Sequence, residues 1–250
     1  TAIAGVGWVV RGASAAVVGV ALIESFGMGG GLGLPKGGAL LVAWGNAICG
    51  NSAIAATARV IRADAEEVAS SIAFTAVLGM VTVLLLPVLV PLLGLSATGY
   101  GVMAGMTVYA VPQVLAATAP VSALSIQIGT FVKLVRVLML GPVIFLLSLA
   151  AGRAMGGRLA VHRLVPWFIL GFLAMLAARS LGFIGAGLAE AMGLASTVLP
   201  ILSRGGLGVG IDLGRVMRAG PRVTAAVVLS LAVLVVASYV MVLLLNLATA

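Results

Sequence analysis

The chain has 250 residues, of which 62% are hydrophobic and only 8% are charged. A soluble domain carries about 25% charged residues, so this chain has too little polar surface to cover a water-exposed globule. The formal net charge of +8 does not indicate a nucleic-acid partner, because the basic residues stand singly between hydrophobic runs, without a basic face or interleaved aromatics.

Eight hydrophobic segments follow one another along the chain, and we expect each to form a transmembrane helix. Their lengths match a hydrocarbon core about 30 Å thick, and they lack the alternation that a transmembrane barrel requires. The segments cover residues 2–28, 39–58, 67–93, 100–119, 122–150, 164–184, 188–212 and 222–247. The sequence therefore predicts an all-α membrane protein with about eight transmembrane helices.

Three of these segments carry helix-breaking residues. The second is interrupted by a glycine- and asparagine-rich stretch at 45–52, and the fourth has Pro112 in its middle. The seventh is broken at Pro200 and again at 205–208. The chain begins at Thr1 without a signal-peptide n-region, so we expect further helices to precede it in a longer protein. A single cysteine, Cys49, excludes an internal disulfide and a multi-cysteine metal site.

The distribution of loop charges predicts an orientation. Two loops carry three arginines each, at 153–163 and at 215–222, and two helices separate them. Both loops therefore face one side, which the positive-inside rule assigns to the cytoplasm. On this count the loop at 59–67, with two arginines and three carboxylates, lies outside, as does the C-terminus.

A short internal match indicates an inverted repeat. The sequence RVIRA at 59–63 matches RVMRA at 215–219 in four of five positions, and the same register aligns Gly50 with Gly206. The second and seventh segments then correspond, and their odd spacing gives them opposite orientations. We expect two broken crossing helices, with residues 1–93 as the last three helices of an incomplete first repeat and 100–250 as a complete five-helix second repeat. The alternative is a chance match, because alanine, valine and glycine are abundant throughout.

The two glycine-rich interruptions are the candidate substrate site. Breaks in a membrane helix persist only where protein, water or ligand satisfies the freed backbone groups, and paired breaks in corresponding halves indicate a transporter's binding site. The alternative is that these glycines allow close helix packing. The candidate residues at or beside the breaks are Asn46, Gly50, Asn51, Ser52, Ser203, Arg204 and Gly206, with Gln113 beside Pro112 as a cavity-lining candidate.

Two cations in the fifth segment indicate the charge of the substrate. Lys133 and Arg136 lie about halfway along an apolar helix, and their spacing of three places them on one face. A charge at the bilayer centre costs roughly 2.5–3.5 kcal/mol even on the lenient insertion scale. All six carboxylates lie near predicted helix ends or in loops, so this pattern favours an anionic substrate over a cation exchanger. A structural alternative is that both cations cap the carbonyl ends of the broken helices, and the two roles are compatible.

Several motifs together resemble the YeiH-like family, whose members are labelled sulfate exporters. The motifs are CGNSAIAA at 49–56, EVA at 67–69, QVLAA at 113–117, KLVR at 133–136, VPWF at 165–168 and GLG at 206–208. The resemblance implies a multi-pass protein of the bacterial inner membrane, with two inverted repeats whose broken helices cross near the midplane, here at 45–52 and 203–210. One departure is Tyr109, where members often have a histidine, which weakens a proton-relay role at this position.

The hypothesis from sequence is a secondary transporter, an exporter of a small anion such as sulfate or a sulfonate, working by alternating access. The alternatives are a sodium- or proton-coupled organic-acid carrier and a membrane scaffold or sensor without transport. We do not expect an enzyme, a cofactor or a metal site, since no nucleophile–base pair or metal cluster is visible. The expected partners are the anion, the lipid bilayer and a second copy of the chain in a homodimer, and nucleic acid is not among them.

Overall fold

The computed structural model describes residues 2–154, scattered residues between 171 and 193, and residues 220–247. The chain divides into two compact units, Thr1–Leu140 with Gly214–Ala250, and Gly141–Leu213. The regular secondary structure of the described part is helical. Its main elements are α1 (Ala2–Gly31), α2 (Lys36–Ala47), α3 (Asn51–Ile61), α4 (Ala65–Leu85), η1 (Leu86–Val88), α5 (Leu89–Leu93), α6 (Ala97–Thr107), α7 (Val111–Thr118), α8 (Ala123–Ala154) and α13 (Gly220–Leu244).

Four of these helical stretches are long and apolar enough to cross a membrane. They are Gly12–Gly31, Ala65–Leu93, Ala123–Ile144 and Thr224–Leu244, which correspond to the first, third, fifth and eighth predicted segments. The sixth predicted segment and the break at 203–210 fall largely or wholly outside the described residues. The division into repeats at 1–93 and 100–250 therefore stays a prediction.

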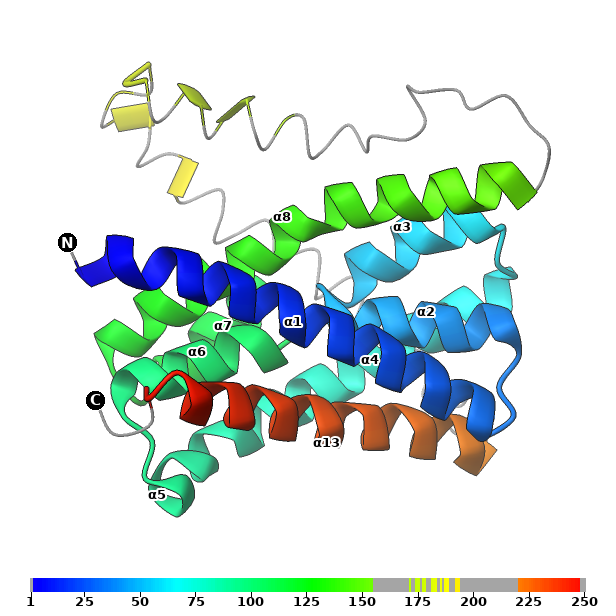
Figure 1. Cartoon of the computed structure of the whole chain (residues 1–250), viewed down its shortest axis with the longest axis horizontal. Helices are drawn as coiled ribbons and strands as arrows, with labels where there is room; N and C mark the ends of the chain where they lie inside the picture. Colours follow the sequence, from blue (N-terminus) through cyan, green and yellow to red (C-terminus); the bar gives the residue numbers. More distant parts are fainter. Residues whose placement is uncertain are drawn as a thin grey trace. The chain divides into compact units, whose positions relative to one another are not determined.

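The second predicted segment forms a hairpin instead of one crossing helix. Its arms α2 and α3 have 12 and 11 residues, so each is roughly 17 Å long, about half a hydrocarbon core. Gly45 near the end of α2 packs against Ile54 of α3, where a Cβ on the glycine would lie 2.9 Å from Ile54 Cδ1. At the base, Gly37 of α2 lies against Glu67 of α4, which follows α3 directly. The chain therefore enters and leaves on the same side (Figure 1).

The fourth predicted segment forms a second hairpin from α6 and α7. The Tyr100 hydroxyl, early in α6, donates to the carbonyl of Ala117, late in α7, at 2.8 Å. In a continuous helix these residues would be about 25 Å apart. Pro112 is not a kink, because it lies in the first turn of α7, where its missing N–H costs no hydrogen bond.

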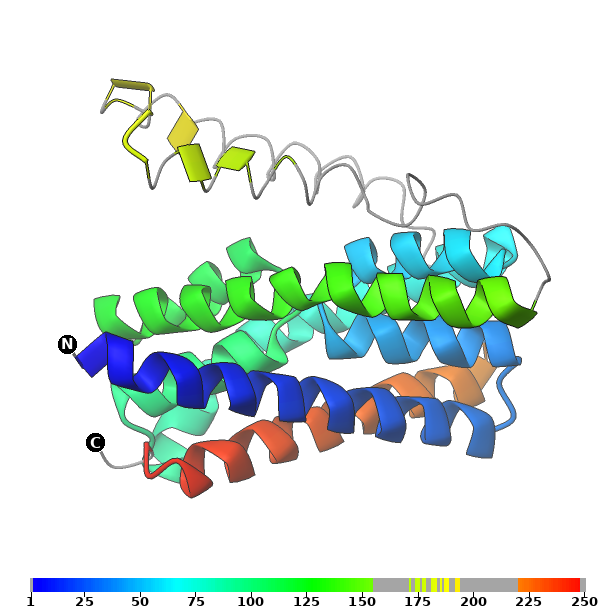
Figure 2. The same ribbon diagram turned by 45° about the horizontal axis from the view of Figure 1, so that its top comes forward.

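The two hairpins enter from opposite ends of the bundle, as Figure 2 shows. The reason is that the 29-residue stretch Ala65–Leu93, long enough to span the membrane, connects the base of the first hairpin to the base of the second. Ser96 at the second base donates to the carbonyl of Leu247, just after α13, at 2.6 Å. The Ser125 hydroxyl, at the start of α8, donates to the carbonyl of Ala97 in α6 at 2.7 Å, so α8 also begins at the base of the second hairpin.

These hairpins correct two predictions. The interruption at 45–52 does not belong to a broken crossing helix, because the chain reverses there. The loop at 62–64 consequently lies at the same end of the bundle as the loop before α2, whereas a crossing second segment would have placed these two loops on opposite sides. Arg59 and Arg62 therefore lie at the end of the bundle where α2 begins, and the membrane side that this end faces stays a prediction.

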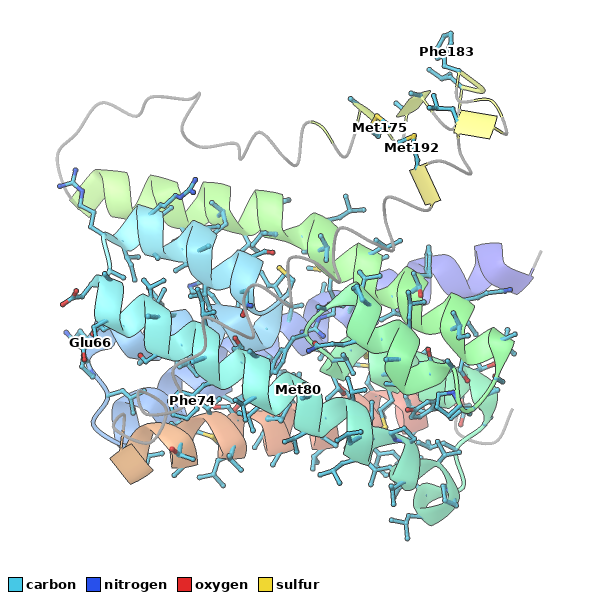
Figure 3. The ribbon with its side chains drawn as sticks, turned by 180° about the vertical axis from the view of Figure 1, so that it is seen from behind. Glu66, Phe74, Met80, Met175, Phe183 and Met192 are labelled. Carbon is cyan, nitrogen blue, oxygen red and sulfur yellow. The ribbon has the colours of Figure 1, made fainter. Side chains whose placement is uncertain are left out.

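The long helices α1 and α13, together with α4, pack around the first hairpin. At one end of α1, Met28 accepts a weak hydrogen bond from Ser230 of α13 at 3.7 Å. Phe74 of α4 packs with Val42 of α2 and Val227 of α13. Met80, further along α4, is 59% exposed (Figure 3). An exposed methionine on a membrane-length helix indicates a face that contacts lipid, whereas Phe74 marks the face that packs inward.

Candidate functional site

The tips of the two hairpins meet in the interior of the described unit. Residues 48–50 form the first tip and residues 108–110 the second. Gly50 has φ +63°, and a Cβ there would lie 3.2 Å from Tyr109 Cβ, so the close approach requires glycine. The Tyr109 hydroxyl donates to Asn46 Oδ1 at 2.5 Å, and both side chains are buried. This bond joins the second tip to the end of α2, next to the first tip.

Two buried cations from α8 cap the C-terminal ends of α2 and α6, which we call the inner arms of the two hairpins; α3 and α7 are the outer arms. Lys133 and Arg136 are both 0% exposed. Lys133 Nζ donates to the carbonyl of Ile48 at the first tip. Arg136 donates to carbonyls of both inner arms, from Nη2 to Asn46 at 3.1 Å and from Nη1 to Gly105 at 3.3 Å. Capping is thus present at the predicted break at 45–52, whereas the other capped end is that of α6 and not the predicted break at 203–210, which lies outside the described residues. These bonds link both hairpins to α8.

The two cations differ in how many donors the backbone uses. Arg136 has five N–H donors. Its Nε bonds the carbonyl of Ala47 at 3.2 Å, and its two terminal nitrogens make two bonds each, to Asn46, Ala47, Gly105 and Met106. Its five bonds equal its donor capacity. Lys133 has three donors and makes one hydrogen bond within the described part of the chain, so its ammonium retains capacity for a ligand.

The tips carry a net positive charge that no described carboxylate balances. The hydrogen-bond acceptors of both cations are backbone carbonyls. A helix C-terminus contributes roughly half a negative charge, so two such ends offset about one of the two cations. Within the described residues, the centre therefore favours an anion.

The outer arms, α3 and α7, begin directly after the tips. The N-terminus of α3 is more exposed than the C-terminal ends that Lys133 and Arg136 cap. Ser52, in the first turn of α3, is exposed, and Asn51 is half-buried. Asn51 Oδ1 accepts from the Thr75 hydroxyl of α4 at 2.7 Å. The positive end of a helix attracts anions through its free N–H groups. The predicted residues Asn51 and Ser52 thus lie where an anion would be favoured.

Gln113 lies at the corresponding place in the second hairpin. Its side chain covers Gly79 of α4, where a Cβ would lie 2.6 Å from Gln113 Nε2. Its Oε1 is buried and has no hydrogen-bond partner among the described residues. The amide therefore remains able to bond a further group near the start of α7.

The remaining predicted site residues, Ser203, Arg204 and Gly206, lie outside the described residues. Among the residues that are described, no group of three or more His, Cys, Asp or Glu side chains could hold a metal ion.

A polar chain that sequence reasoning missed runs from the tips to α1. Asn46 Nδ2 donates to Ser25 Oγ at 3.3 Å, and Ser25 Oγ donates to Glu24 Oε1 at 3.0 Å. The sequence placed Glu24 near a helix end. It lies instead within the candidate span Gly12–Gly31, about 10 Å from the end of that span at 1.5 Å per residue. Its Oε2 is buried without a partner in the described part of the chain.

Comparison with known proteins identifies the family. The family described as Conserved hypothetical protein 698 matches residues 1–227 of the chain. The chain belongs to this family. The YeiH-like resemblance of its motifs is thereby confirmed.

The relatives of the chain are named UPF0324 membrane proteins. The one from Brucella suis is 59% identical over 218 residues, covering 87% of the chain and 65% of the relative. The one from Agrobacterium fabrum is 52% identical over 240 residues, covering 96% and 69%. A relative from Bacillus cereus is 37% identical over 206 residues, covering 81% and 61%. No solved structure matched the chain.

The names of these relatives agree with the apolar helices of the structure. The relatives' names and the four apolar spans together confirm a multi-pass membrane protein. The chain spans about two-thirds of the length of its Brucella suis relative.

Several residues at and around the tips of this UPF0324 chain were harder to identify from the sequence than Lys133 and Arg136. Tyr109 was noted as a departure from the histidine that the resembling family often has there, not as a hydrogen-bond partner of Asn46. Thr75 and Ser25 gave no signal, because small hydroxyl residues are common in membrane helices and usually bond their own backbone. The carbonyls of Gly105 and Met106 are backbone groups, which only the fold can place.

Proposed function

We propose that this chain is part of a secondary transporter that moves a small anion, such as sulfate or a sulfonate, by alternating access. The observation that carries the proposal is the meeting of two opposed hairpins beside two buried cations that have no carboxylate partner among the described residues. Lys133 supplies positive charge to the anion through its remaining donors. Asn51, Ser52 and Gln113 supply hydrogen bonds from the starts of the outer arms.

The opposed hairpins support transport over a purely structural role. Helix ends within hydrocarbon need partners, so non-helical backbone at that depth is tolerated where protein or a water-filled cavity receives it. Each hairpin reaches the tips from a different side of the membrane. Small movements of one hairpin relative to the other would therefore expose the same anion site to either side in turn.

The element order supports an inverted repeat, though a shorter one than the sequence indicated. A hairpin followed by a long span occurs twice, in α2–α5 and in α6–α8, and the second copy runs in the opposite direction. Gly45 and Gly105 precede the two tips at equal distance. We propose these two stretches as the repeated units. Because the second and fourth of the eight predicted segments form these hairpins, the predicted count of eight crossing helices does not stand.

The test is anion flux into proteoliposomes. The purified UPF0324 protein should take up labelled sulfate or a labelled sulfonate faster than empty liposomes do, and unlabelled anion inside should accelerate the exchange. Competition by carboxylates with flux that follows a sodium or pH gradient would instead identify an organic-acid carrier. Absence of flux for every anion tested would favour a scaffold or sensor.

A further inference from the structure

The surroundings of Arg136 have the chemical composition of a monovalent-cation site. Carbonyl oxygens from the C-terminal ends of two different hairpin arms converge on its guanidinium; they belong to Asn46, Ala47, Gly105 and Met106. A fifth carbonyl, that of Ile48, binds the adjacent ammonium of Lys133. In secondary transporters, unwound carbonyls and half-helix C-termini are the groups that coordinate a coupling sodium ion.

We infer that Arg136, with Lys133 beside it, is a tethered cation that takes the place of a dissociable coupling sodium ion between the hairpins. The inference rests on the transport function proposed above and concerns how that transport is coupled. Because the cation is covalently attached to α8, it stays between the hairpins through the whole cycle. Anion movement therefore does not require sodium.

The hydrogen bonds of Arg136 explain why sodium has no room there. All five N–H donors are engaged with carbonyls, so these oxygens are already directed at a positive charge. A second cation at the same oxygens would face the positive charge of the guanidinium in a poorly screened interior. Both side chains are 0% exposed, so water does not reduce this repulsion.

Removing the guanidinium should convert the cluster into a site for free cations. Arg136→Ala leaves at least four carbonyls without a donor inside the membrane, where each unsatisfied group is costly. A soluble cation that binds only the folded state would then stabilise it by mass action. We expect Arg136→Ala to melt at a lower temperature than the parent in choline chloride. Sodium or methylguanidinium chloride at equal ionic strength should raise its melting temperature by several degrees.

Two controls separate this effect from charge and salt. Arg59→Ala removes an exposed arginine from the last turn of α3 and should melt alike in choline and sodium chloride. The parent should behave in the same way. Saturable stabilisation of the parent by sodium would overturn the inference, and so would an Arg136→Ala variant that folds but responds to none of the cations.

A second measurement needs no variant and stands even if Arg136→Ala does not fold. Anion flux by the parent in proteoliposomes should have the same initial rate in sodium and in choline buffers. Flux that rises saturably with sodium overturns the tethered cation but leaves the anion transporter standing. Absence of flux overturns the proposed function, whereas the melting comparison decides the cation site independently of flux.

Discussion

Tyr109 shows how much of the candidate site depends on single hydrogen bonds between residues far apart in the sequence. Its hydroxyl joins the second tip to Asn46 at the end of α2, and Asn46 continues to Ser25 on α1. The sequence predicted the importance of Lys133 and Arg136, because charges in an apolar helix are conspicuous. It could not predict the pairing of Tyr109 with Asn46, because nothing local in either segment specifies a partner 63 residues away.

Tyr109→Phe should destabilise the protein by leaving Asn46 Oδ1 without its donor. Leaving one buried acceptor unsatisfied costs about 1–3 kcal/mol in the free energy of unfolding. Denaturant unfolding in detergent measures this loss. The matched control is Tyr239→Phe on α13, a half-buried tyrosine without a hydrogen bond among those described here. Equal stability of the two variants would show that the bond between Tyr109 and Asn46 is not stabilising.

At the scale of elements, the close packing of α6 against α8 determines the position of Lys133 and Arg136 relative to the hairpin tips. A Cβ on Gly105 would lie 2.6 Å from the carbonyl oxygen of Gly129 and 2.7 Å from Val132 Cβ. The sequence located the interruptions near residues 45–52 and Pro112. It did not reveal that the chain reverses, because a glycine and an N-terminal proline are compatible with a kink as well as with a hairpin.

Gly105→Ala should therefore destabilise the protein. The added methyl meets backbone and a β-branched side chain, and overpacking of this kind costs about 1–3 kcal/mol. Gly19→Ala on α1 is the control, since a Cβ there meets nothing within 4 Å, and alanine is the better helix former by about 1 kcal/mol. The two variants should shift the melting temperature in opposite directions. A stabilising Gly105→Ala would contradict the packing of α6 against α8.

At the scale of the whole molecule, the hairpins change the topology that loop counting predicts. If 36–61 and 97–118 each crossed the membrane, residues 65 and 119 would lie on the same side. With two hairpins they lie on opposite sides, because only the span Ala65–Leu93 separates the two bases. The spans themselves were predictable from hydrophobic length. The fold of half-length helices was not, because two consecutive half-length helices together have the length of one crossing segment.

Cysteine labelling distinguishes these topologies. In a Cys49→Ser background, Ala65→Cys and Ala119→Cys place single thiols at exposed positions. A membrane-impermeant maleimide added to intact cells should label position 119, and position 65 should react only after the membrane is disrupted. Labelling of both positions from the same side would contradict the hairpins.

Anion flux by Lys133 variants tests most directly whether the cationic tips bind the transported anion. Lys133→Gln removes the charge but keeps a donor for the carbonyl of Ile48, and Lys133→Arg keeps both. We expect both variants to melt close to the parent, with Lys133→Arg retaining sulfate or sulfonate flux and Lys133→Gln losing it. A folded Lys133→Gln protein that transports at the parent's rate would contradict the account.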